Sequence, residues 1–252
     1  LKSEQLDINV KVWHRETNLK LACSMITAID WIFKFETKAI ILEDDLHFDK
    51  RFFSYISDNF HYVERGLVFM LSGNRLIDSE NKSQLLNYPL VWGWAINRKN
   101  WLEFRREMFS RMIFDKKVKL STQIFWLVGR KRAINCKIES WAIIFASYIR
   151  SKNKNVLLPN ENLIENRGTD HHSTHTKSTD WFMSTKIGNN FGLTFIDLHQ
   201  NTSSQEKLNL EYEQKLYFIK QKHILMFPLL LCKNDNTLSK RLQLIRIPTI
   251  SS

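Results

Sequence analysis

Three consecutive carboxylates, Glu43, Asp44 and Asp45, stand out in the stretch KAIILEDDLHF, residues 38–48. They follow the apolar run 39–42, which is typical of a short buried strand. Neighbouring negative charges repel one another and raise each other's pKa unless a positive group lies among them. Mg²⁺ and Mn²⁺ prefer such oxygen ligands and often share them with substrate phosphates. The same triplet without a cation suits a helix N-terminus, where the helix dipole favours acids. The triplet alone leaves both interpretations open.

Apolar periodicity predicts the elements that position these acids. Helical spacing predicts four helices: 18–35, one that starts after the cap residue Asp49, 98–112 and 137–150. Short buried strands are expected at 39–42, 67–71 and 155–160, and residues 88–96 are expected to be extended. This alternation predicts an α/β fold with a mostly parallel sheet flanked by helices. Ligands on such sheets bind beyond the carboxyl ends of the strands, where the triplet lies. A further helix over 203–226 predicts a C-terminal helical extension.

Length and composition fit one large domain, or one domain with an appendage. The chain has 252 residues, of which 43% are hydrophobic, enough to bury a full core. Its three cysteines, Cys23, Cys136 and Cys232, are far apart and odd in number. They suggest neither a disulfide framework nor a cysteine zinc site, so we expect a reducing compartment. No apolar run approaches the roughly 18 residues of a membrane span.

The net charge of +11 is concentrated in one block, Arg98 to Lys137. Twelve Lys or Arg residues there face only three acids. The block suits either a solvated helical face or an anionic partner such as a lipid headgroup, an acidic glycan or nucleic acid. On this basis we expect a cytoplasmic protein, peripheral at the inner face of a membrane.

Five segments in order resemble the GT-A glycosyltransferases, in particular the N-acetylglucosaminyltransferase I type and related bacterial sugar transferases. IILEDDLHFDKRFFSYI looks like the family's metal-binding DXD-type strand and the helix after it. The other four segments are RETNLKLACSMITAIDWIF (15–33), YPLVWGWAINRKNW (88–101), ESWAI (139–143) and NLIENRGTDHHSTHT (162–176). Together they cover about Arg15 to Thr176.

The resemblance implies roles for individual residues. Asp45 would bind Mn²⁺ or Mg²⁺ directly, with His175 as a further metal or diphosphate contact. Glu139 would be the general base that takes the proton of the acceptor hydroxyl. The donor-binding residues would be Asn18, Glu43, Asp44, Trp92, Gly93 and Trp94. Without the resemblance, Trp92 and Trp94 fit core or rim aromatics, and Glu139 a helix start.

The sequence also departs from the family. Lys20 stands where the family usually has Gly. His171, His172 and Ser173 replace the family's small residues close to His175. The family's first strand and helix, which hold the nucleotide base, would precede residue 1. The chain is therefore either a fragment or holds the base differently.

The resemblance implies a GT-A-like catalytic domain over 1–176 and a C-terminal extension over 177–252. The expected activity is a metal-dependent, inverting transfer of a sugar from a nucleotide-sugar donor to a glycan or lipid-linked acceptor, as in polysaccharide biosynthesis. Expected partners are the donor, the acceptor and an anionic membrane surface, with no nucleic acid. Two alternatives stay open: a non-catalytic module that binds anionic glycan, lipid or nucleic acid, and a metal-dependent phosphoesterase that uses the same acids.

Overall fold

The computed structural model describes residues 9–77, 84–108, 118, 120–134, 141–168, 185–188 and 202–216. Its helices are α1 (Lys20–Ile32), α2 (Arg51–Glu64), α3 (Arg98–Glu107), α4 (Leu120–Ile134), α5 (Ala142–Ser151) and α6 (Thr202–Leu216). Its strands are β1 (Lys38–Ile41), β2 (Leu46–Phe48), β3 (Met70–Ser72), β4 (Gln84–Leu86), β5 (Trp94–Asn97), β6 (Val156–Leu158) and β7 (Ile164–Asn166). No helix in this described part is long and apolar enough to cross a membrane.

A mixed central sheet confirms the predicted α/β class. Its strand order is β1-β5-β3-β6-β4, and β2 pairs with β7 in a separate two-stranded sheet. β3 and β6 are parallel neighbours, whereas β5 is antiparallel to both β1 and β3. β1, β3 and β6 therefore run the same way, as predicted, but β5 and β4 run against them. The reason is local: the chain already lies at the carboxyl edge at Leu90, whose carbonyl accepts a 2.7 Å bond from the Ser72 hydroxyl, so β5 starts from that edge.

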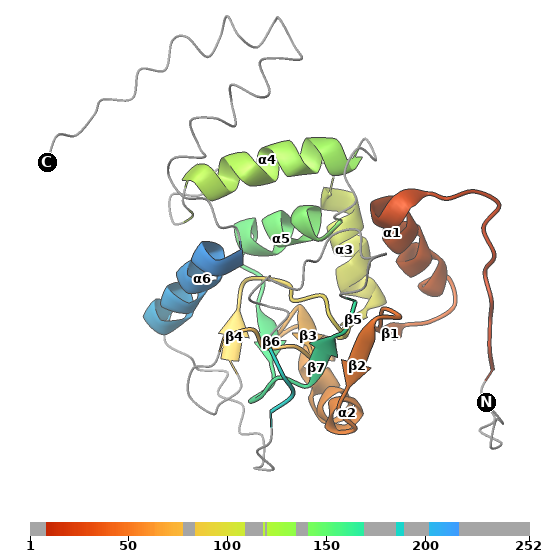
Figure 1. Cartoon of the computed structure of the whole chain (residues 1–252), viewed down its shortest axis with the longest axis horizontal. Coiled ribbons are helices and arrows are strands. Elements are labelled where there is room, and N and C mark those ends of the chain that lie inside the picture. The colour runs from red at the N-terminus through yellow and green to blue at the C-terminus, as the bar shows by residue number, and fades with distance from the viewer. Residues whose placement is uncertain are drawn as a thin grey trace, which may run out of the picture.

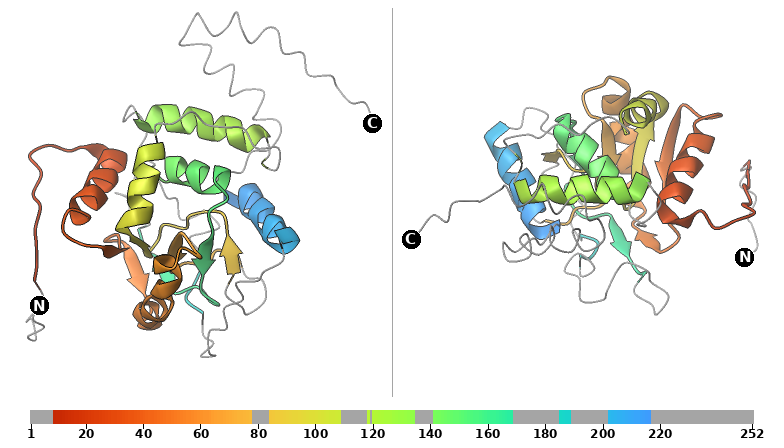
Figure 2. Two further views of the ribbon diagram at one scale, coloured as in Figure 1. Left: turned by 180° about the vertical axis from the view of Figure 1, so that it is seen from behind. Right: turned by 90° about the horizontal axis from the view of Figure 1, so that it is seen from above.

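Helices cover both faces of the sheet. Strand alternation sends Met70 to one core and its neighbour Leu71 to the other. The first core contains side chains of α1, α3, α5 and α6, and the second contains those of α2. Figure 1 shows α2 on one side of the strands and α3, α4 and α5 on the other, and Figure 2 shows the same layers from behind and from above. The result is a layered arrangement with a sheet in the middle.

Four elements are absent from the sequence-based prediction. The strands β2, β4 and β7 have only three residues each, too few to show an alternating pattern. The helix α4 packs on α5, with Gly129 directly against Ile143. Its apolar residues do not form one clear stripe, because Trp126 is buried while its neighbour Leu127 is exposed.

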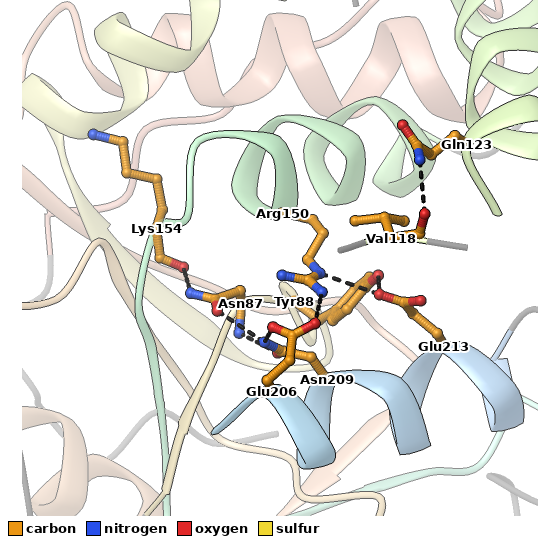
Figure 3. A network of polar contacts seen from close by, with 9 residues as sticks. All are labelled: Asn87, Tyr88, Val118, Gln123, Arg150, Lys154, Glu206, Asn209 and Glu213. Atoms are coloured by element: carbon orange, nitrogen blue, oxygen red, sulfur yellow. Dashed lines mark hydrogen bonds and ion pairs between the residues drawn. The ribbon is translucent and has the colours of Figure 1, made fainter. Parts of the chain in front are cut away.

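Helix α6 is part of the folded unit. It lies beside β4 (Figure 1), and it confirms a helix in the C-terminal extension; residues 217–226 of the predicted helix lie outside the described range. Figure 3 shows how it is attached. The buried guanidinium of Arg150 on α5 donates to Glu206 and, at 3.1 Å, to Glu213 on α6. The Tyr88 hydroxyl donates to the same Glu213 oxygen at 2.7 Å.

One cysteine prediction was wrong. Cys23 on α1 is in a disulfide, and its partner lies outside the described residues. Distance along the sequence does not measure distance in the fold, so three scattered cysteines can still contain a pair. The argument for a reducing compartment rested on unpaired cysteines and therefore loses its basis.

Candidate functional site

The acidic triplet forms the turn between β1 and β2. Ile41, the last residue of β1, is buried, and the Leu46 amide then donates to the Glu43 carbonyl across the turn at 3.4 Å. Asp44 is exposed, whereas Glu43 and Asp45 are half-buried. Burial raises the pKa of Glu43 to about 7, and the charges of Asp45 and Asp44 add to this effect. Ionising all three carboxyls of the triplet therefore costs free energy in the folded protein.

Asp45 lies against the segment that follows β7. Its carbonyl accepts a 2.9 Å bond from the Arg167 amide, which continues the β2–β7 ladder. Gly168 packs directly on the Asp45 carboxylate, so closely that a side chain at 168 would collide with it. The carboxylate atom Oδ1 of Asp45 is buried and has no hydrogen-bond partner among the described residues. A buried anionic oxygen without a donor is the kind of atom that a cation would satisfy.

Gly93 brings a second segment to the triplet. Its φ of +59° is left-handed, a conformation that favours glycine. A Cβ at this position would lie 2.8 Å from Ile164 Cδ1 and 3.4 Å from Leu42 Cδ2. Both the conformation and the close approach therefore require glycine. The segment Trp92–Trp94 is thereby held against the residue that precedes Glu43.

The loop after β3 joins these segments together. The Gly73 amide donates to the Gly93 carbonyl at 2.7 Å, and the Gly73 carbonyl accepts from the Leu163 amide at 3.0 Å. The Phe52 ring of α2 lies where a side chain at 73 would stand. The structure therefore gathers the predicted triplet and the predicted Trp-Gly-Trp segment at one edge of the sheet.

Trp94 has a core position instead of a pocket position. Its side chain is fully buried, stacked on Trp141 with ring centroids 5.7 Å apart and beside Phe145 at 5.5 Å. An indole enclosed in this way offers no face to a donor sugar, so we correct its assigned role from contact to support. Trp92 is half-buried and remains a candidate for direct contact.

Asn18 shapes the start of α1. Its side-chain oxygen accepts a 2.8 Å bond from the Lys20 amide, and Lys20 has a φ of +60°. The position that the resemblance assigns to glycine thus has a glycine-like conformation in this chain too. Within the described part of the chain, no hydrogen bond or ion pair joins Asn18 to the acidic triplet.

Glu139 and His175 lie outside the described residues, so their predicted roles stay predictions. The described chain leaves off at Gly168, beside Asp45, and resumes at 185–188. There the Gly188 amide donates to the Asn162 carbonyl at 3.0 Å, and Arg51 donates to the Gly188 carbonyl at 2.6 Å. Both ends of the segment that contains His175 are therefore anchored near the carboxyl edge.

Three glycines that allow segments to pack closely at this site were not among the predicted site residues. Gly73, Gly168 and Gly188 each lie where a side chain would collide with a neighbour. Of these, Gly73 carried a usable sequence signal for close backbone approach, because it lies in a turn directly after the predicted strand 67–71. Gly188 in addition packs on Glu161, which lies 3.7 Å from Arg51.

The described residues contain no group of three or more His, Cys, Asp or Glu arranged for a metal ion. Mg²⁺ commonly binds through one or two carboxylates and completes its shell with water and substrate phosphates. Asp45, with its buried unpartnered oxygen, fits that more limited protein contribution.

The basic block is partly engaged inside the protein. The Arg105 guanidinium binds both carboxylate oxygens of Asp30 on α1, and Arg98 donates to the Glu36 carbonyl at 2.8 Å. Lys99 and Arg106 are exposed. The remaining basic side chains of the block lie outside what the structure describes, so its partner stays a prediction.

Comparison with known proteins adds no family assignment. No family model matches this chain, and no curated protein has a significantly similar sequence.

Proposed function

We propose that this protein is a metal-dependent, inverting glycosyltransferase that uses a nucleotide-sugar donor. The proposal rests on the ordered resemblance to GT-A enzymes and on one structural observation that supports it. The observation is the half-buried Asp45 carboxylate, whose Oδ1 has no partner in the described structure, at the carboxyl edge of the sheet.

Asp45 would hold the cation, with His175 as the second expected ligand. Bound Mn²⁺ or Mg²⁺ would neutralise charge on the diphosphate leaving group. Glu43 would contact a hydroxyl of the donor sugar; without a cation, burial and the charges of Asp45 and Asp44 raise its pKa to about 7, and a bound cation would favour its ionised form, which accepts a hydrogen bond from that hydroxyl. Gly93 would let backbone approach the donor closely, with Trp92 beside it.

Glu139 would act on the acceptor. A carboxylate on the face of the sugar opposite the leaving group can take the hydroxyl proton as the anomeric carbon gains oxocarbenium character. This geometry inverts the configuration at that carbon. The acceptor class that we propose is a glycan or a lipid-linked glycan.

The direct test is donor turnover by the full chain. Nucleotide-sugar donors are incubated with Mn²⁺, and released nucleoside diphosphate, inorganic phosphate and nucleotide fragments are measured separately. We expect metal-dependent release of nucleoside diphosphate. Release of inorganic phosphate would indicate a phosphoesterase, and binding without turnover would indicate a binding module.

Asp45→Asn tests the metal assignment within the same assay. An amide keeps the shape but cannot supply an anionic ligand, so metal-dependent binding of a nucleoside diphosphate should be lost while the fold is kept. Asp58→Asn, an exposed acid on α2, is the matched control and should bind as the wild type does. Unchanged Mn²⁺ dependence in Asp45→Asn would refute the assignment.

A further inference from the structure

Helix α1 has apolar side chains on two opposite faces. Ala22, Ile26 and Ile29 are buried and face the core. Leu21, Ala28 and Trp31 recur at spacings of seven and three on the opposite side, and Phe35 continues that stripe beyond the helix end. An ordinary surface helix has charged and polar residues opposite its buried face, so large exposed apolar side chains there need a reason. Figure 1 and the right panel of Figure 2 show α1 at one end of the molecule.

The segment before α1 adds to this outer stripe and leaves it exposed. The Trp13 indole stacks on Trp31 with ring centroids 5.6 Å apart, and Trp31 contacts Phe35 edge-on at 5.7 Å. Trp13 nevertheless remains 43% exposed and Phe35 53% exposed. Val10 and Val12 on the same segment are exposed as well. We name the surface formed by Val10, Val12, Trp13, Leu21, Trp31 and Phe35 the α1 outer face.

Cations lie directly on the rings of this face. The Lys11 ammonium lies 4.2 Å from the centroid of Phe35, and the Arg15 guanidinium lies 4.5 Å from that of Trp13. Lys20 and Lys34 are exposed at the two ends of the helix. Neither Lys11 nor Arg15 forms an ion pair with a carboxylate in the described structure, although Arg15 donates to the Ser24 carbonyl at 2.7 Å. The acids nearest in sequence are Asp7, Glu16, Asp30 and Glu36, of which Asp30 is paired with Arg105.

From this juxtaposition of exposed Trp, Phe and Val with Lys and Arg, we propose that the α1 outer face docks on an anionic phospholipid bilayer. Indole and phenyl rings are favoured at the level of lipid headgroups. Lysine and arginine stems lie along apolar surface while their charges reach the anionic headgroups. Trp, Phe and Arg are also enriched at protein interfaces, but lysine is depleted there. The three lysines at this face, Lys11, Lys20 and Lys34, therefore favour a bilayer over a second protein as the occupant. The inference does not depend on the proposed function, since it requires no donor and no metal.

Vesicle cosedimentation of the full chain tests it. The vesicles are phosphatidylcholine alone and phosphatidylcholine mixed with phosphatidylglycerol. The test variant is Trp13→Ser with Phe35→Ser. The matched control is Phe53→Ser with Leu67→Ser, which removes side chains of similar exposure, 43% and 50%, from elsewhere.

We expect the wild type and the control to bind the anionic vesicles. The test variant should bind them at least about tenfold more weakly, because it loses two large apolar side chains. Binding should weaken with added salt, because headgroup attraction is screened. A second variant, Lys11→Gln with Arg15→Gln, should lose the preference for anionic over neutral vesicles while its apolar surface is kept.

Three outcomes would overturn the proposal. One is equal vesicle binding by the wild type and the test variant, and another is no binding by the wild type. The third is a wild type that is dimeric in sedimentation equilibrium while the test variant is monomeric, which would assign the face to a second copy of the chain. Circular dichroism of each variant confirms that loss of binding is not loss of fold.

Discussion

At the scale of single residues, Glu43 is the clearest case of a side chain whose environment changes its chemistry. Its carboxyl is partly removed from water and lies near the charges of Asp45 and Asp44, which together raise its pKa from 4.5 to about 7. In the unfolded chain the same carboxyl ionises first as the pH rises. The native state therefore holds more protons than the unfolded state between about pH 4.5 and pH 7, and its stability falls with rising pH across that window.

Glu43→Gln removes the pH-dependent effect of this carboxyl on the free energy of unfolding. In the presence of EDTA, we expect the variant to be more stable than the wild type at about pH 8, with the difference shrinking toward about pH 4. Thermal unfolding at a series of pH values measures it, and Glu36→Gln, an exposed glutamate, is the control. A stability difference that does not change with pH would contradict the expected burial of Glu43.

Lys20 is a residue in a glycine conformation. Its φ of +60° costs a residue with a Cβ about 1 kcal/mol. The Asn18 bond to its backbone amide does not depend on the side chain.

Lys20→Gly should therefore raise the free energy of unfolding by about 1 kcal/mol, and Lys20→Val should lower it, because a branched Cβ is more crowded there. Urea denaturation measures both. The control is Ser57→Gly, at an exposed position inside α2, which should lower the free energy of unfolding by about 0.5 kcal/mol. A loss of stability in Lys20→Gly would show that the left-handed turn is not formed.

At the scale of elements, the contact between α5 and α6 is held by a buried ion network. Arg150 and Glu213 are almost fully buried and 3.1 Å apart, with Glu206 as a second partner. Removing one member leaves the other charge buried without compensation, which is usually more costly than removing both.

We expect Arg150→Met and Glu213→Leu each to destabilise the protein by about 3 kcal/mol or more. The double variant should lose less than the sum of the two by about 1 kcal/mol or more. The control is Lys152→Met, two residues after Arg150, which breaks the exposed ion pair between Lys152 and Glu107. It should lower the free energy of unfolding by less than about 1 kcal/mol. Strictly additive losses would mean that Arg150 and Glu213 do not act as a pair.

At the scale of the whole molecule, a disulfide at Cys23 ties α1 to a cysteine outside the described residues. The chain has three cysteines, so one disulfide leaves one free thiol. Thiol titration of the unfolded, unreduced protein should therefore count one thiol, and titration after reduction should count three. Reduction should also lower the stability by about 2 to 4 kcal/mol. Three thiols before reduction would show that Cys23 is unpaired.

The local features of this protein were determined by its sequence. Apolar runs and helical spacing placed β1, β3, β6 and the helices α1, α2, α3 and α5, because each depends on a periodicity within one segment. The acidic triplet was predicted at the carboxyl end of its strand for the same reason, since its position follows directly from the length of the apolar run.

Only the tertiary structure decided how segments distant in sequence meet. It reversed β5, paired β2 with β7, enclosed Trp94 in the core and joined Cys23 in a disulfide. It also placed Gly168 on the carboxylate of Asp45, whose Oδ1 is buried without a hydrogen-bond partner in the described structure. These outcomes depend on close approach between separate segments, and a residue's type and neighbours in sequence do not state which distant backbone will lie beside it.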